Sequence, residues 1–246
     1  MSDVALVINL QKRNDRWKFM QRVAERINVQ VERVEAVDGH SVDLASVSLD
    51  PLVLTTLQTG RKFSTVHIES RGALGCMMSH RKAWARVVEL GVPTLVLEDD
   101  ADPSERASDW VKQARQQVAA GTWDIVLLGT HGQSPPGVGL RELPSWFKTG
   151  VVYTGSWAVL VSPQAAARLL EASRVLTFQS DAFLHTVGLR VGFVSAFKQA
   201  MFFRNPDIKH IALEPVDKTG FVVAFVLGVL SCAGVLAFFK WSRHHK

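Results

Sequence analysis

Short apolar runs alternate with helical patterns along most of this chain. The runs that favour strands are 4–10, 29–37, 94–98, 124–129, 156–161 and 191–197. Helical patterns lie between several of them, at 14–27, 79–90, from 102–105 onward and at 163–171. Strands that alternate with helices indicate an α/β domain with a mostly parallel sheet. Ligands of such sheets bind beyond the carboxyl ends of the strands, so residues there are the first candidates for a site.

Polar residues mark the predicted helix starts. The candidate N-caps are Asn14, Ser79, Ser162 and Ser180, the last before a short helix that carries Asp181. Their side-chain oxygens can accept hydrogen bonds from the first free backbone N–H groups of a helix. Residues 40–71, rich in Ser, Thr and Leu, fit no predicted element.

An acidic cluster follows the run at 94–98, in the sequence LVLEDDAD (95–102). Clustered carboxylates repel one another unless a cation, a proton or a helix end neutralises them. Mg²⁺ and Mn²⁺ prefer oxygen ligands, so the cluster predicts a divalent metal site for the two phosphates of a nucleotide. If the strand continues, Glu98 and Asp100 share one of its faces, and so do Asp100 and Asp102, which makes Asp100 the central ligand.

Non-catalytic interpretations of these acids stay open. Asp102 precedes a proline, and Glu105 lies three residues later, which is a capping-box pattern, so Asp102 can cap a helix instead of binding metal. Asp99 can be a solvated acid. The whole cluster can also be an acidic loop that faces water.

Six motifs occur in an order that resembles glycosyltransferase family 25, which includes bacterial lipooligosaccharide glycosyltransferases and collagen galactosyltransferases. They are NLQKRNDR (9–16), AVDG (36–39), GALGCMMSHRKAW (72–84), LVLEDDAD (95–102), YTGSWAVLVSPQAAARLL (153–170) and SDAFL (180–184). Each motif alone is weak, whereas six in one order are specific. The resemblance spans residues 4–205, nearly all of the chain before its apolar end.

The resemblance implies a GT-A fold, a Rossmann-like nucleotide-diphospho-sugar transferase domain. It implies an inverting transfer of a hexose, galactose or glucose, from a UDP-sugar to a hydroxyl of a glycan, a lipid-linked acceptor or a hydroxylated protein. It also implies Mn²⁺ or Mg²⁺, with Glu98, Asp99 and Asp100 on the family's acidic motif. Two departures concern the acceptor: Ala73-Leu74 replaces the usual glutamate, and Val159 stands where the late strand often has an aromatic residue, with Tyr153 and Trp157 nearby.

The resemblance also suggests catalytic roles. An inverting transfer needs a base for the acceptor proton and a positive charge for the leaving diphosphate. Asp181 matches the late aspartate of the family and is the candidate base, while a metal on Asp100 would supply the charge. Asp181 can alternatively be an acid that stabilises the first turn of its helix.

The predicted donor-binding residues follow the first two strands or lie in the third and fourth motifs. They are Asn9, Leu10, Arg13, Arg16, Asp38, Gly39, Gly75, His80 and Asp99. Arginine suits phosphate recognition, but Arg13 fits a solvated basic helix face better. Gly75 allows either close backbone approach to a phosphate or a turn. Asp38-Gly39 is a turn signal in the first place and a donor site only by resemblance. His80 is either a donor contact or a histidine whose hydrogen bonds are satisfied within the protein.

Residues 220–239, GFVVAFVLGVLSCAGVLAFF, contain no charged side chain. About 20 apolar residues let a helix cross a bilayer, and Lys240 and Trp241 follow at the interface. We predict a single-pass tail anchor at 220–239, after a domain at 1–213 and a linker at 214–219 and before a basic tail at 240–246. A buried core helix is the alternative. The spacing of Ala224, Gly228 and Cys232 suggests a homodimer through this helix.

Charge and cysteine content bound the partners. A net charge of +5 fits phosphates or anionic lipids. The sequence shows no zinc-finger spacing, aromatic RNP motif or long basic block, so we expect no nucleic-acid partner. The two cysteines, Cys76 and Cys232, form no CxxC pair, which argues against a disulfide framework or a zinc site. The first 15 residues lack a secretory pattern, which favours a cytosolic domain and leaves a lumenal one open.

Two other functions remain as alternatives. The first is a non-catalytic scaffold that binds a nucleotide sugar or a glycan at a membrane, in which the acids only maintain the fold. The second is a metal-dependent phosphohydrolase, which would need a nucleophilic aspartate after the first strand. Asn9 occupies that position and counts against it.

Overall fold

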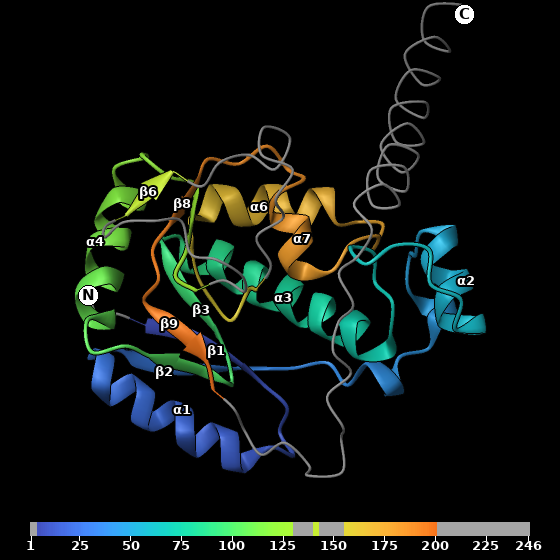
Figure 1. The fold of residues 1–246 in the computed structure, drawn as a ribbon, viewed down its shortest axis with the longest axis horizontal. Coiled ribbons are helices and arrows are strands. Elements are labelled where there is room, and N and C mark those ends of the chain that lie inside the picture. The colour runs from blue at the N-terminus through green and yellow to red at the C-terminus, as the bar shows by residue number, and fades with distance from the viewer. Residues whose placement is uncertain (1–3, 130–139, 143–154, 201–246) are drawn as a thin grey trace, which may run out of the picture.

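A computed structural model describes residues 4–129, 140–142 and 155–200, and they form a mixed α/β fold (Figure 1). The main sheet has seven strands in the order β2-β1-β3-β7-β5-β8-β6. They are β1 (Val4–Asn9), β2 (Gln30–Glu35), β3 (Thr94–Glu98), β5 (Ile125–Leu127), β6 (Arg141–Glu142), β7 (Ala158–Val161) and β8 (Val191–Phe193). The described helices are α1 (Asn14–Ile27), α2 (Pro51–Thr59), α3 (Arg71–Leu90), α4 (Ala107–Ala119), α6 (Pro163–Ala172) and α7 (Ser180–Leu184), with 3₁₀ helices η1 (Gly39–Ser41) and η2 (Leu44–Ser46).

The sheet is mostly parallel, as predicted. Strand β1 pairs in parallel with β2 and β3, and β5 pairs in parallel with β8. Strand β7 lies antiparallel between β3 and β5, and β6 is antiparallel to β8. An antiparallel neighbour needs no helical crossover. The sequence that follows β5 is the Gly/Pro-rich run GTHGQSPPGVG.

Two apolar cores cover the two faces of the sheet. Successive side chains of a strand point to opposite faces. Accordingly, Leu6 and Ile8 pack with α3 and α6 on one face, while Ala5 and Val7 pack with α1 and α4 on the other. Figure 1 shows these helix pairs on opposite sides of the sheet. The chain therefore folds as a three-layer sandwich, with the strand ends free to form a site.

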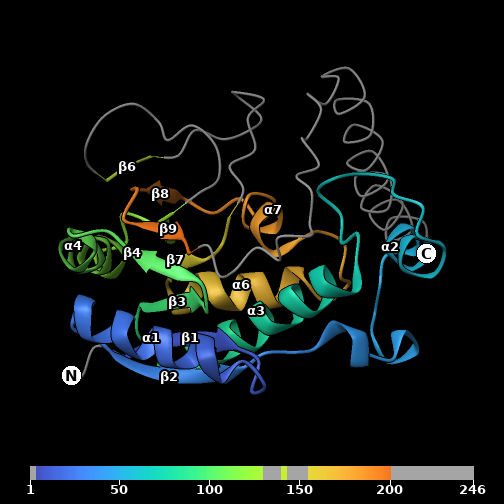
Figure 2. The same ribbon diagram turned by 60° about the horizontal axis from the view of Figure 1, so that its bottom comes forward.

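A second, two-stranded sheet follows the acidic cluster. It joins β4 (Ala101–Pro103) to β9 (Phe197–Gln199), which are antiparallel (Figure 2). The predicted helix start at 102–105 is therefore wrong: α4 begins at Ala107, its N-cap Arg106 makes no side-chain cap bond, and Asp102 does not cap it. The residue before a proline is biased toward extended backbone, which explains why Asp102 prefers a strand.

The predicted N-caps succeed only in part. Ser162 caps α6, because its hydroxyl accepts a bond from Ala165 N–H at 3.1 Å. Ser79 is not a cap: α3 begins at Arg71, Ser70 caps it, and Ser79 lies inside the helix. Asn14 and Ser180 are the first residues of their helices and do not occupy the N-cap position. The glycines early in α3 are poor helix formers, which explains why its first turns were not predicted.

Helix α2 lies in the segment that fitted no predicted element. The Asp50 carboxylate accepts a bond from Leu52 N–H at 2.8 Å, Pro51 begins the helix, and Gly60 ends it with φ 75°. Asp-Pro at the start and Gly at the end are ordinary helix boundaries. The signal was therefore present in the sequence, although the helix has only a weak amphipathic pattern.

The described helices include none that is long and apolar enough to cross a membrane. The predicted anchor at 220–239, the linker at 214–219 and the basic tail lie outside the described residues. The anchor, the domain boundaries and the homodimer through the tail therefore stay predictions. Tyr153 also lies outside the described residues.

Candidate active site

The candidate site lies at the carboxyl ends of two neighbouring strands. Asn9 ends β1 and Glu98 ends β3, and the register pairs Ile8 with Glu98, so both ends meet at one edge of the sheet. The helices that pack on these strands lie on opposite faces, α1 on one and α3 on the other. A crevice between such strand ends is where α/β sheets bind ligands.

The acids of LVLEDDAD do not alternate along one strand. Strand β3 ends at Glu98, and Asp99 and Asp100 form a turn before β4. The prediction that Glu98 and Asp100 share a strand face is therefore wrong. A turn points the three carboxylates at three different sets of partners, and each set compensates its acid differently.

Asp99 is held by the last residue of β1 and by a residue of α1. Asn9 Nδ2 donates a bond to Asp99 Oδ2 at 2.8 Å, and Arg16 Nη1 contacts Oδ1 at 2.5 Å. The Asp99 side chain is only 13% exposed. Asp99 is therefore not a solvated acid, and Arg16, predicted to bind the donor, supplies a positive charge to the acidic cluster.

Asp100 is the least compensated of the three acids. Its Oδ2 accepts a bond from Gln199 Nε2 at 3.2 Å and lies 3.7 Å from Arg16 Nη1. Its side chain is 12% exposed, and Oδ1 is buried with no hydrogen-bond partner among the described residues. Burial, with the nearby charge of Glu98, raises the pKa of Asp100 to about 6, against the hydrogen bond from Gln199 and the charge of Arg16. Arg16 therefore compensates the Asp100 carboxylate only in part.

The donor set around Asp100 fits a hard divalent cation. Asn9 Oδ1 is also buried, and the described part of the chain offers it no hydrogen-bond partner. These two unsatisfied acceptor oxygens, one from an amide and one from a carboxylate, are of the kind that Mg²⁺ and Mn²⁺ prefer as ligands. Asp100 can therefore act as the central metal ligand, as the sequence predicts, and Asn9 is an additional candidate.

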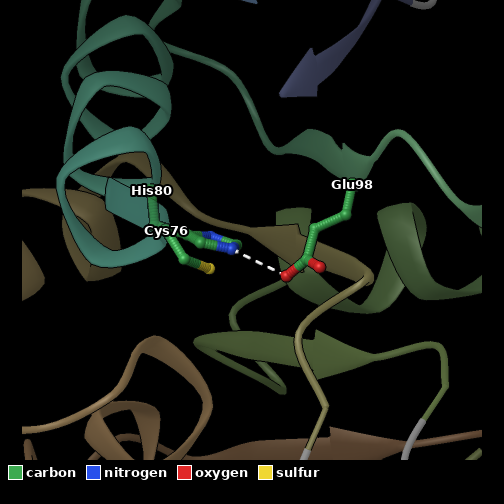
Figure 3. Close-up of side chains that lie close together, drawn as sticks. All are labelled: Cys76, His80 and Glu98. Atoms are coloured by element: carbon green, nitrogen blue, oxygen red, sulfur yellow. Dashed lines mark hydrogen bonds and ion pairs between the residues drawn. The ribbon is translucent and has the colours of Figure 1, made fainter. Parts of the chain in front are cut away.

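Glu98 points toward α3 (Figure 3). Its Oε1 lies 3.0 Å from His80 Nε2 and accepts a bond from the Ser156 hydroxyl at 2.8 Å. His80 is only 2% exposed. Burial disfavours the imidazolium, but hydrogen bonds with Cys76 and Glu98 outweigh it and raise the pKa of His80. His80 thus contacts Glu98 directly, and any effect of its ring on a bound donor would pass through that carboxylate.

Asp102 carries two ion pairs. Its Oδ1 lies 3.1 Å from Arg26 Nη1 and its Oδ2 lies 3.3 Å from Lys198 Nζ. Both oxygens therefore already face a cation of the protein. The geometry supports a role in holding α1 against the β4–β9 sheet, and the predicted metal role of Asp102 stays a prediction.

Asp181 lies in the first turn of α7, close to the acidic cluster. Its Oδ2 accepts a bond from Gly155 N–H at 2.9 Å. Next to it, the Ser180 hydroxyl lies 3.1 Å from the Ser156 hydroxyl, which in turn bonds Glu98. The two serines therefore connect the start of α7 to the end of β3, and the candidate base lies at the same edge of the sheet as the acids.

A polar groove of about 480 Å³ opens beyond β1 and β2. It is lined by Leu10, Gln11, Lys12, Glu35, Ala36, Val37, Asp38, Ser41 and Lys82. Lys12 Nζ contacts Asp38 Oδ2 at 2.6 Å and holds the pKa of that carboxyl below its ordinary value. The predicted donor residues Leu10 and Asp38 thus share one groove, whereas Arg13 is partly exposed and pairs with Asp15.

Gly39 and Gly75 let two segments touch backbone to backbone. A Cβ on Gly39 would lie 1.7 Å from the Arg71 carbonyl oxygen, and one on Gly75 would lie 2.6 Å from Gly39 N. Gly75 lies inside α3 and forms no turn. The close approach that these glycines permit is therefore between η1 and α3, and a direct role in donor binding stays a prediction.

We expect Gly39→Ala to lower the free energy of unfolding by about 2 kcal/mol or more, because the methyl group forces η1 away from α3. The matched control is Gly72→Ala, where the added Cβ meets only Ser70 Oγ, at 3.8 Å. That helical alanine should be neutral or stabilising by up to about 1 kcal/mol. Urea denaturation of both variants measures the difference. Equal stabilities would contradict the close contact.

An α/β sheet with acids at this edge is consistent with a Rossmann-like glycosyltransferase. The chain belongs to glycosyltransferase family 25: the family model described as "Glycosyltransferase family 25 (LPS biosynthesis protein)" matches residues 2–132. This confirms the resemblance seen in the sequence motifs.

Three curated relatives show what the chain is similar to. A glycosyltransferase 25 family member of Drosophila pseudoobscura pseudoobscura is 29% identical over 185 residues, 69% of this chain and 27% of the relative. Human procollagen galactosyltransferase 2 is 28% identical over 130 residues, 52% of this chain and 20% of the relative. Mouse inactive glycosyltransferase 25 family member 3 is 26% identical over 215 residues, 85% of this chain and 33% of the relative. The chain thus spans a third or less of these relatives' lengths.

The sequence predicted no role in the site for three polar residues, although it marked Ser180 as a helix cap. Ser156 and Ser180 form the contact between β7, α7 and Glu98, and Gln199 bonds Asp100. Ser156 lies in the fifth motif and is the first residue of the predicted strand at 156–161, which was a usable signal. Gln199 had none, because its place depends on the pairing of β9 with a strand almost a hundred residues earlier.

Proposed function

We propose that this protein is a metal-dependent inverting glycosyltransferase of GT-A fold that moves a hexose, galactose or glucose, from a UDP-sugar to a hydroxyl. The acceptor would be a glycan, a lipid-linked sugar or a hydroxylated protein. Family membership supports sugar transfer, and one relative is named a procollagen galactosyltransferase. The observation that carries the proposal is Asp100: a buried carboxylate just beyond the carboxyl end of β3, with an oxygen unsatisfied among the described residues and a pKa raised to about 6.

Asp100 and Asn9 would hold the metal, through the two oxygens left without partners in the described chain. The ion, when bound, supplies positive charge for the leaving diphosphate. Gln199 holds the other oxygen of Asp100, and Ala200 N–H donates to its carbonyl at 2.6 Å, so side chain and turn are both fixed. Arg16 adds a second positive charge next to Asp99 and Asp100.

Asp181 would accept the proton of the acceptor hydroxyl. A general base must lie within hydrogen-bond reach of that hydroxyl and be held in place. Bonds from Gly155 N–H and Ala182 N–H fix the two oxygens of Asp181, and each oxygen retains a lone pair for the acceptor. The groove of Lys12, Asp38 and Lys82 would take the nucleoside part of the donor.

The second candidate function is a non-catalytic scaffold that binds a nucleotide sugar or glycan. Two features favour it. Relatives from mouse and human are named inactive family members. In addition, His80 contacts Glu98 and Arg16 contacts Asp99, so cations of the protein itself compensate two of the three acids.

Membrane attachment is part of the proposal. The uncharged segment 220–239 would anchor the protein as a single-pass tail, with the catalytic domain on the cytosolic side. Fractionation of cells that express the full chain tests the anchor, because a tail-anchored protein resists extraction at high salt and is released by detergent.

UDP release by the purified full chain tests the transferase. We expect release from one UDP-hexose in Mn²⁺ or Mg²⁺ and none in EDTA, because the leaving diphosphate needs the positive charge. Calorimetric titration with UDP separates the two functions if release is absent. Metal-dependent UDP binding would point to a missing acceptor. Equal binding with and without metal, and no release from any sugar, would favour the scaffold and contradict the transferase.

A further inference from the structure

A cluster of three different donor atoms lies between α3 and the end of β3. Cys76 and His80 are four residues apart on α3, so both side chains lie on one face of the helix. Figure 3 shows the thiol and the imidazole pointing toward the carboxylate of Glu98. Their ligand atoms all lie within 4.8 Å of one another, and His80 Nε2 is 3.0 Å from Glu98 Oε1.

We propose that Cys76, His80 and Glu98 bind a Zn²⁺-class ion, at a second site distinct from the oxygen site of Asp100. Sulfur, nitrogen and oxygen donors together suit Zn²⁺, whereas Mg²⁺ and Mn²⁺ prefer oxygen. Two ligands four apart on a helix are the spacing by which helical motifs present a metal pair. The sequence argued against a zinc site because it has no CxxC pair, but a helix needs no such pair.

The distances require only a small adjustment of side chains. Ligand atoms at roughly 2.0–2.3 Å from a tetrahedral Zn²⁺ lie roughly 3.3–3.8 Å apart. The three donor atoms span no more than 4.8 Å, and the pair in hydrogen-bond contact is closer than that range. Tetrahedral spacing therefore requires His80 and Glu98 to separate by a few tenths of an ångström, within the reach of side-chain rotation.

The surroundings supply a fourth ligand position and outer contacts. The Ser156 hydroxyl lies 2.8 Å from Glu98 Oε1 and 3.3 Å from His80 Nε2, so it or a water can complete a tetrahedron. The Ser180 hydroxyl lies 3.5 Å from Cys76 Sγ and can donate to the sulfur. Such outer hydrogen bonds orient metal ligands. Cys76 is partly exposed, which gives the ion a path from solvent.

Binding exchanges protons for the ion. Cys76 gives up its thiol proton and His80 the proton it shares with Glu98, both to solvent, and the sulfur and nitrogen lone pairs then bind the metal. Zinc affinity should therefore fall as the pH is lowered. The two sites share no ligand: the Asp100 carboxylate bonds Gln199, and the zinc donors are Cys76, His80 and Glu98, although the charge of Glu98 acts on Asp100. The zinc site therefore does not rest on the proposed sugar transfer.

Cobalt titration tests the site directly. The purified full chain, stripped of metal by a chelator, is titrated with Co²⁺, and absorption is recorded. We expect one equivalent to produce a near-ultraviolet thiolate-to-cobalt charge-transfer band and visible bands of tetrahedral Co²⁺, which Zn²⁺ then removes. Cys76→Ser should lose the charge-transfer band, and His80→Asn should weaken Co²⁺ binding at least about tenfold.

Two matched variants serve as controls. Cys232→Ser removes the other cysteine of the chain and should keep the band. Asp100→Asn should also keep the charge-transfer band, even if this variant no longer releases UDP in the presence of metal. The band therefore tests the zinc site, and UDP release tests the proposed sugar transfer. Circular dichroism establishes that each variant is folded, and Cys76→Ser, which keeps the size of the side chain, carries the test if His80→Asn unfolds. No charge-transfer band in the folded wild type, or a band that Cys76→Ser retains, overturns the proposal.

Discussion

Asp100→Asn is expected to reduce sugar transfer at least about 100-fold and yet to stabilise the metal-free protein. The activity falls because an amide is a weaker metal ligand than a carboxylate, which removes charge stabilisation from the leaving diphosphate. The stability rises because the buried carboxylate has a pKa of about 6, against 3.8 for an ordinary aspartate. Ionisation of this carboxylate therefore costs more in the folded than in the unfolded state, and asparagine removes that cost. A pKa rise of about two units corresponds to a gain in the free energy of unfolding of about 1–3 kcal/mol, the lower values applying if the surroundings of the charge relax.

The stability gain has a definite pH dependence. A group whose pKa is raised by folding favours the folded state only while it is protonated. Well below pH 3.8 the aspartate is protonated in both the folded and the unfolded state, and the stability of the variant should approach that of the wild type. The gain grows as the pH rises to about 6 and is constant above it. Urea denaturation at pH 4, 5, 6 and 8 in EDTA measures this.

Metal and a second variant complete the test. Saturating Mn²⁺ should stabilise the wild type and not the variant, which narrows the difference between them. Asp99→Asn is the matched control, because it breaks the contact with Arg16 and should destabilise at pH 8. A metal-free Asp100→Asn protein that is less stable than the wild type at pH 8 would show that the carboxylate is already well compensated.

Asp181→Asn is expected to lower kcat by about 10²–10⁴-fold, the usual contribution of a general base. Asparagine keeps one oxygen that can accept from Gly155 N–H and loses only the bond from the neighbouring Ala182 N–H, so the first turn of α7 should hold its position. Steady-state kinetics with the hexose donor measures kcat, and calorimetry should show UDP affinity in Mn²⁺ unchanged. A selective loss of kcat would separate a base from a residue that only binds the donor.

Asp109→Asn provides a control for the alternative role of Asp181. Asp109 is likewise an acid in the first turn of its helix, α4, and has no proposed part in catalysis. Both substitutions remove a charge that favours a helix start, worth about 0.3–1 kcal/mol. If the two variants lose kcat equally little, Asp181 only stabilises its helix and the base lies elsewhere.

Local patterns predicted the sheet well because burial acts on each strand separately. Strand β3 was predicted with its exact bounds, and β1, β2 and β7 within one or two residues. Ser162-Pro163 also marked the start of α6, because capping depends on neighbouring residues only. The position of the acids at the strand ends followed from these elements.

The directions of the acidic side chains could not be predicted in the same way. Alternation along a strand holds only while the strand continues, and β3 ends at Glu98. Once the chain turns, tertiary contacts decide: Arg16 from α1, His80 from α3 and Gln199 from β9 each face a different carboxylate. Pairings between segments this far apart leave no periodic trace in one sequence.

The contact of Gly39 with Gly75 has a consequence for how the site meets its ligand. It joins the segment that lines the groove to the helix that carries His80, and it does so through main-chain atoms, with no rotamers to freeze. The spacing between groove and acids is therefore established during folding. A ligand that spans the groove and the acids need not order these two parts on binding. The loss of conformational entropy occurs during folding, so the site is preorganised for its ligand.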